Sequence, residues 1–171
     1  MAKSKAQAGF TVIELMVAVA VVSILLTVGV PAFGSLIERQ QLSGAAQTFA
    51  SDLRRAKSDA IAKGPGGSVT ITLASDSSAG TWSYAVTNSG STPTKNVSQA
   101  DFSGVTAVLT GWGVSAGAAA FSIEAVRGLS AAGEGSITFT SGNASLTVER
   151  NLAGRVRVCS ATGDFGYSTC S

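Results

Sequence analysis

From residue 9 to residue 37 the chain reads GFTVIELMVAVAVVSILLTVGVPAFGSLI. Hydrophobic residues occupy 20 of the 28 positions from Phe10 to Ile37, and no charged residue occurs between Leu15 and Ile37. A helix of about 20 apolar residues is long enough to cross the hydrocarbon core of a bilayer. We therefore predict a transmembrane helix over residues 10–37.

The apolar stretch contains one acidic residue, Glu14. A lone carboxylate in a membrane helix costs roughly 2.5 to 3.5 kcal/mol on insertion scales, so we expect it to have a partner. The segment 1–9 precedes the apolar stretch and carries Lys3 and Lys5, a slight bias that favours a cytoplasmic N-terminus. A cleavable secretory signal would place its apolar region before the cleavage site, and that order is not the one found here.

The stretch from Gly9 to Leu15 resembles the class III leader of type IV pilins and type II secretion pseudopilins. The resemblance implies that 1–9 is a leader, that the prepilin peptidase cleaves after Gly9, and that it methylates the new amine of Phe10. It also implies that Glu14 meets the N-terminal amine of a neighbouring subunit during assembly. Pro31 stands where many of these proteins carry a helix-kinking proline.

The same resemblance implies an α+β, type IV pilin-like fold, in which a long N-terminal helix packs on an antiparallel β-sheet. It places the chain in the bacterial inner membrane as a single-pass protein with a periplasmic C-terminal domain. From there the subunit would join other pilin or pseudopilin subunits in a pilus or pseudopilus.

After Glu38 the hydrophobic pattern becomes one-sided, which predicts that residues 38–63 continue the helix as an amphipathic segment. Its apolar residues recur at alternating steps of 4 and 3: Leu42, Ala46, Phe49, Leu53, Ala56 and Ala60. The sequence Gly64-Pro65-Gly66-Gly67 is expected to end this helix.

Residues 64–158 are predicted to form a β-rich domain. Apolar residues alternate with polar ones in two pairs of segments that are typical of hairpins: Val69–Leu73 with Trp82–Val86, and Ile137–Phe139 with Leu146–Val148. Between them, the stretch 88–135 specifies strand register poorly. Within it we expect strands at Val105–Leu109 and Phe121–Val126, and a loop or edge strand at Ala118–Ala120.

The composition argues against an enzyme. The chain has no histidine, which excludes Ser-His and Cys-His pairs and histidine-ligated zinc. No acid-base or nucleophile-base pair can be assembled with confidence, so we predict no catalytic site, no cofactor and no metal site. The formal charge is +2, and without the two leader lysines the chain has ten basic and ten acidic residues. Basicity can therefore matter only in local clusters.

One such cluster lies near the C-terminus and comprises Arg150, Arg155 and Arg157. In a strand, Val156 and Val158 would face the core while the last two arginines point outward together, suited to phosphate contact. Phe165 and Tyr167 could then stack on the bases of a single strand. A second cluster, Arg54, Arg55 and Lys57, lies on the helix.

The segment Gly154-Arg155-Val156-Arg157 is similar to the end of the GspH/FimT family of minor pilins, in which the FimT branch binds DNA through a Gly-Arg-x-Arg motif during natural transformation. This implies non-specific DNA binding through Gly154, Arg155, Arg157 and Arg150. In the alternative, the arginines keep an edge strand soluble or pair with Glu149 or Asp164. The chain would then be a structural GspH/FimU-like subunit of type II secretion or pilus priming, without DNA binding.

Cys159 and Cys170 are the only cysteines. In an exported domain a disulfide is the favoured interpretation, and it would pin the tail 159–171 beside the arginines. A metal site or a cysteine nucleophile is the weaker alternative, because both lack their usual histidine companion.

Overall fold

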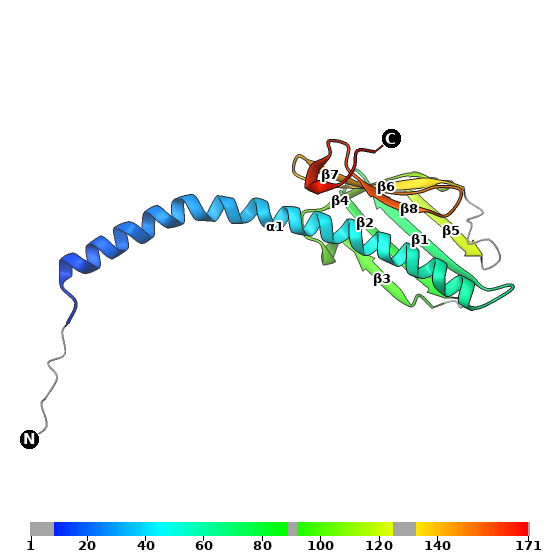
Figure 1. Ribbon diagram of the computed structural model, residues 1–171, viewed down its shortest axis with the longest axis horizontal. Coiled ribbons are helices and arrows are strands. Elements are labelled where there is room, and N and C mark those ends of the chain that lie inside the picture. Colours follow the sequence, from blue (N-terminus) through cyan, green and yellow to red (C-terminus); the bar gives the residue numbers. More distant parts are fainter. Residues whose placement is uncertain (1–8, 89–91, 125–132, 171) are drawn as a thin grey trace, which may run out of the picture. The chain divides into compact units, whose positions relative to one another are not determined.

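The computed structural model describes residues 9–88, 92–124 and 133–170 (Figure 1). The chain divides into two compact units, Met1–Ile37 and Glu38–Ser171. Helix α1, Val12–Ala62, begins in the first unit and ends in the second.

The first unit contains the apolar part of α1. The Thr11 hydroxyl accepts a hydrogen bond from the Glu14 amide at 3.3 Å, which satisfies one of the free N–H groups of the first turn. The hydroxyls of Ser23 and Thr27 donate to carbonyls one turn earlier, at 2.8 and 2.6 Å. All described side chains from Phe10 to Ile37 are exposed.

No helix in the described part of the chain combines the length and the apolar character that a membrane span requires.

The second half of α1 buries the apolar stripe that its sequence predicts. The six residues of the stripe are 0 or 1% exposed: Leu42, Ala46, Phe49, Leu53, Ala56 and Ala60. The helix ends at Ala62, and Gly64 follows with a φ of +74°, a left-handed conformation that glycine adopts without steric cost. The predicted helix end is confirmed.

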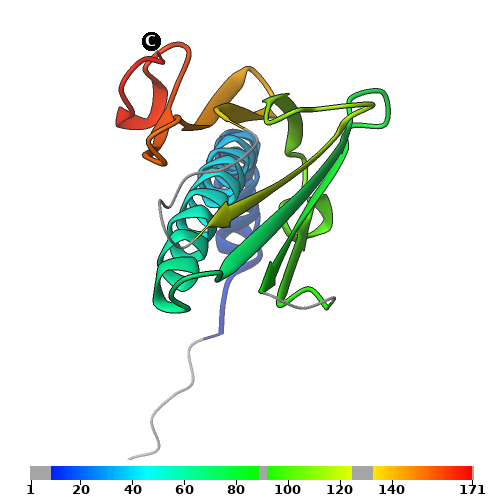
Figure 2. The same cartoon turned by 90° about the vertical axis from the view of Figure 1, so that its right-hand side faces the viewer.

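Eight strands form two four-stranded antiparallel sheets, with orders β3-β2-β1-β5 and β4-β6-β7-β8. The strands are β1 Ser68–Asp76, β2 Thr81–Asn88, β3 Lys95–Ser98, β4 Thr106–Gly111, β5 Ala118–Glu124, β6 Gly135–Ser141, β7 Ala144–Arg150 and β8 Val156–Cys159. In Figure 2, strands β1 and β5 lie to one side of the second half of α1.

Both predicted hairpins are present. β1 pairs with β2 so that Leu73 lies opposite Tyr84, and β6 pairs with β7 so that Phe139 lies opposite Leu146. Residues 118–120 open β5, which is an edge strand. The expected strand Phe121–Val126 ends at Glu124, and its last two residues lie outside the described part of the chain.

Phe49 of α1 joins the helix to both sheets. Its ring lies 5.0 Å from that of Tyr84 in the first sheet and 6.2 Å from that of Phe139 in the second, measured between centroids. Trp112, which follows β4, also lies 6.2 Å from Phe49. Contacts of this kind add to the stabilisation that burial itself provides. These rings belong to a single hydrophobic core between α1 and the two sheets.

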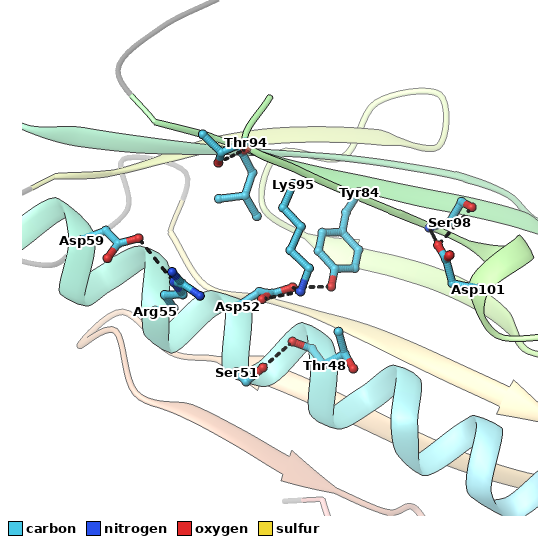
Figure 3. Close-up of polar contacts among 11 residues, drawn as sticks. Thr48, Ser51, Asp52, Arg55, Asp59, Tyr84, Thr94, Lys95, Ser98 and Asp101 are labelled. Atoms are coloured by element: carbon cyan, nitrogen blue, oxygen red, sulfur yellow. Dashed lines mark hydrogen bonds and ion pairs between the residues drawn. The ribbon is translucent and has the colours of Figure 1, made fainter. Parts of the chain in front are cut away.

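A buried polar contact also holds the helix to the first sheet (Figure 3). The Tyr84 hydroxyl donates to Asp52 Oδ2 at 2.6 Å, and Lys95 Nζ donates to Asp52 Oδ1 and Oδ2 at 2.8 and 2.6 Å. Burial raises the pKa of Tyr84, and its hydrogen bond to Asp52 raises it further. Lys95 begins β3, a short strand that the sequence did not predict, so this ion pair helps to fix β3 beside α1.

Candidate nucleic-acid interface

Gly154 lies in a tight turn between β7 and β8. Its amide donates to the Asn151 carbonyl at 2.9 Å, and its φ is +71°. The Asn151 side chain accepts a hydrogen bond from the Arg155 amide at 2.9 Å, which closes the turn from the other side. Only glycine adopts this φ without strain, so Gly154 fixes the direction in which the chain enters β8. Gly154 therefore supplies the turn that precedes the strand.

Arg155 and Arg157 flank Val156 at the start of β8 but have different surroundings. Arg155 precedes the strand and is exposed. Arg157 lies opposite Glu149 of β7 and forms an ion pair with it, with 2.9 Å between Nη2 and Oε2. This is one of the two pairings named by the alternative interpretation of the arginines. Arg155 is therefore the more available of the two cations.

Arg150 does not belong to an exposed basic surface, and the structure corrects this part of the prediction. The residue is 2% exposed, and its guanidinium carbon lies 5.7 Å from the centroid of the Phe121 ring. Burial lowers the pKa of Arg150. Leu146, Val148 and Arg150 alternate along β7 and share its buried face. That alternation is visible in the sequence and could have placed Arg150 inside.

A groove of about 580 Å³ runs beside these residues. Its charged and amide-bearing lining consists of Glu134, Glu149, Arg150, Asn151, Arg155 and Arg157. Arg155 and Arg157 therefore face two carboxylates, and Arg157 is already paired with one of them. The third cation, Arg150, is almost wholly buried. The groove alone is nearly neutral, so any attraction that it exerts on phosphates depends on cations around it.

Helix α1 supplies such cations. Arg54 Nη2 lies 3.4 Å from the Val156 carbonyl oxygen, and Lys57 Nζ lies 3.5 Å from the Gly154 carbonyl oxygen. Arg55, between them in sequence, is instead 3.9 Å from Asp59. The structure thus brings two of the three helix cations to the Gly154–Arg157 segment.

The C-terminal tail is closed by the predicted disulfide between Cys159 and Cys170. The Ser160 amide donates to the Ser168 carbonyl at 3.0 Å, which adds a backbone bond across the same loop. Because the two sulfurs are bonded to each other, they are not thiolate ligands for a metal, although Glu149 lies close to them.

The two aromatic residues of the tail pack against the protein. Phe165 lies under Arg39, with 5.7 Å between the guanidinium carbon and the ring centroid, and the Tyr167 hydroxyl accepts a hydrogen bond from Gln47 at 2.7 Å. Both rings are partly buried against the core. These contacts hold the tail on α1, and Arg39 covers one face of the Phe165 ring.

The residues predicted for processing and assembly lie in the first unit. Phe10 is 86% exposed, and Glu14 is exposed in the first turn of α1. Within the part of the chain that the structure describes, no ion pair involves the Glu14 carboxylate.

Comparisons with known proteins agree with this architecture. Residues 4–30 match the model of the prokaryotic N-terminal methylation motif, and residues 45–164, well over half of the chain, match that of type II transport protein GspH. A comparison with curated proteins gave no significant match. The crystal structure of the type IV minor pilin FimU from Pseudomonas aeruginosa strain PAO1 has a similar fold. Its TM-score is 0.50 at 17% identity, over 72% of this chain and 91% of that chain.

The methylation motif, the GspH domain and a long helix packed on antiparallel sheets all point to the same conclusion: the chain belongs to the GspH/FimT family of pilin-like proteins.

Proposed function

We propose that this chain is a minor type IV pilin that binds DNA non-specifically through the Gly154–Arg157 segment, for uptake during natural transformation. The observation that supports this most directly is the position of Arg155. It is exposed, it follows a turn that Gly154 and Asn151 hold in place, and no ion pair involves it among the described residues. An exposed, unpaired arginine on a rigid turn is suited to bidentate contact with phosphate.

The proposed contact is with the phosphate backbone and not with base edges. The groove is lined by arginines and glutamates whose charges nearly balance, and its arginines suit contact with phosphate oxygens. Binding should therefore be independent of sequence and should weaken steeply as salt is added. We infer no catalytic role, since the family is one of pilin-like subunits.

A binding assay with the full chain in a neutral detergent tests the proposal. Wild type should shift the anisotropy of a short labelled duplex at low salt, and Arg155→Gln with Arg157→Gln should bind much more weakly. The double variant Arg55→Gln with Lys63→Gln removes the same charge from the end of α1 and serves as the control. Equal binding by wild type and the Arg155/Arg157 variant would show that the site is wrong.

A structural subunit without DNA binding is the second candidate, and the ion pair between Arg157 and Glu149 favours it. In that case the arginine keeps the β7–β8 pair in register instead of meeting phosphate. Wild-type protein that fails to bind DNA but co-purifies with other minor subunits would favour this function.

A further inference from the structure

The strongest unexplained feature of the second unit is the contact between α1 and the open edge of β8. β8 is the last strand of its sheet, so one side of its backbone has no neighbouring strand within the part of the chain that the structure describes. The carbonyls of Gly154 and Val156 are met on that side by Lys57 and Arg54. The helix therefore covers a strand edge with two cations, side chains that natural proteins often place at such edges.

Arg54 and Lys57 have more hydrogen-bond donors than these two carbonyl contacts require. An arginine has five N–H donors and a lysine ammonium has three, whereas each is seen to donate to one carbonyl. A neutral carbonyl also leaves the positive charge in place. Arg54 is exposed and Lys57 is half-buried, and neither forms an ion pair with a described carboxylate.

Arg155 is a third cation beside Arg54 and Lys57. It follows directly on Gly154, whose carbonyl Lys57 contacts, and precedes Val156, whose carbonyl Arg54 contacts. The three cations thus adjoin one short segment of backbone. We name Arg54, Lys57 and Arg155 the edge cations. Arg155 also lines the groove, so Arg54 and Lys57 add two positive charges beside a site where arginines and glutamates nearly balance.

We propose that the edge cations form a single phosphate-binding surface, so that helix α1 supplies part of the nucleic-acid interface together with the Gly154–Arg157 segment. This inference rests on the proposed DNA binding and extends it to the helix. The ligand is the sugar-phosphate backbone, since three cations with no acceptor groups among them suit phosphate oxygens and carry no base-reading pattern.

The helix provides a matched control for this proposal. Arg54 and Arg55 are adjacent, of equal charge and exposed, but Arg55 lies near Asp59 and faces the Asp52–Lys95 contact (Figure 3). Arg54→Gln and Arg55→Gln therefore change the net charge equally, and only the first removes an edge cation.

The test measures anisotropy of a short labelled duplex against the full chain in neutral detergent, over a series of NaCl concentrations. Arg54→Gln and Lys57→Gln should each weaken binding and reduce the slope of log K against log [salt] by about 1, as expected when one phosphate contact is lost. Arg55→Gln should keep the wild-type slope. Arg54→Lys, which keeps the charge, should keep most of the affinity, and urea unfolding confirms that each variant is folded.

The outcomes separate the two claims. If Arg155→Gln loses affinity while Arg54→Gln, Lys57→Gln and Arg55→Gln all match wild type, the edge-cation surface is wrong and the DNA-binding function stands. If Arg54→Gln and Arg55→Gln weaken binding equally, only net charge matters and the surface is again wrong. If wild type does not bind DNA, both claims fail.

Discussion

Helix α1 is continuous from Val12 to Ala62, yet its two halves meet different surroundings. The described side chains from Phe10 to Ile37 are exposed, although this half is apolar all round. The half that follows Glu38 carries a single apolar stripe, and the two sheets cover it completely. A continuous helix is thus present in both halves, and among the described residues the second half packs against the two sheets.

One acidic residue in each half, Asp52 and Glu14, differs in the same way in its surroundings. Asp52 is 9% exposed and is bonded to Tyr84 and Lys95. Glu14 forms no ion pair within the described residues. Buried carboxylates are stable only when they are paired, and Asp52 has its partners in the same domain. We propose that Glu14 finds its partner in a neighbouring subunit. On this proposal, the first half of α1 serves assembly and the second half serves folding.

The largest effect is expected at Glu14. If its partner is the N-terminal amine of a neighbouring subunit, Glu14→Ala should abolish incorporation into filaments, because the pairing is lost while no contact inside the domain changes. Immunoblots of sheared and sedimented filaments measure this, with Glu38→Ala as an acid-removing control on the same helix. Normal incorporation of Glu14→Ala would disprove the assembly role.

A matched pair of leucines tests the contrast in packing. Leu42 is 0% exposed and Leu25 is 65% exposed. Leu42→Ala should lower the free energy of unfolding by about 2 to 5 kcal/mol, because it leaves a cavity in the core, whereas Leu25→Ala should leave it unchanged. Urea unfolding followed by the fluorescence of Trp82 and Trp112, both buried, reports on the domain. Equal destabilisation by the two substitutions would refute the contrast.

The smallest effect on stability is expected from the hydrogen bond between Tyr84 and Asp52, which lies in the second half of α1. Tyr84→Phe removes the hydrogen bond to Asp52 and should cost about 1 to 2 kcal/mol at neutral pH. The folded-state pKa of Tyr84 is raised above its unfolded value of about 10, so its contribution is complete below about pH 10. That contribution falls as the pH rises further.

Urea unfolding at a series of pH values above neutrality measures this dependence. Wild type should lose stability above about pH 10 more steeply than Tyr84→Phe, and the difference between them should shrink. Parallel curves for the two proteins would mean that Tyr84 does not ionise on unfolding in this range.

The sequence indicates much of the fold because its signals are local. The change from all-round to one-sided hydrophobicity near Glu38 predicts both halves of α1, and alternation predicts the two hairpins. β3 was missed because Lys95–Ser98 has only one buried residue, Val97, and so shows no alternation. β3 is placed by its pairing with β2 and by the contact between Lys95 and Asp52, which are 43 residues apart.

The candidate site was only partly predictable. The Gly-Arg-x-Arg segment, the turn at Gly154 and the disulfide follow from the order of residues. The burial of Arg150 follows from the alternation along β7, a signal that the prediction did not use. The pairing of Arg157 with Glu149 follows from the register of β7 and β8, which a string of arginines does not reveal.

By itself, the sequence determined that this chain has an apolar N-terminal helix, an amphipathic continuation and a β domain with a bridged tail. It could do so because periodicity and composition are properties of residues that are neighbours in the chain. Only the tertiary structure decided which cations stand together. Arg54 and Val156 are separated by 102 residues, and Lys57 and Gly154 by 97. They meet because the apolar stripe of α1 buries itself against both sheets, and that packing brings the open edge of β8 to the helix.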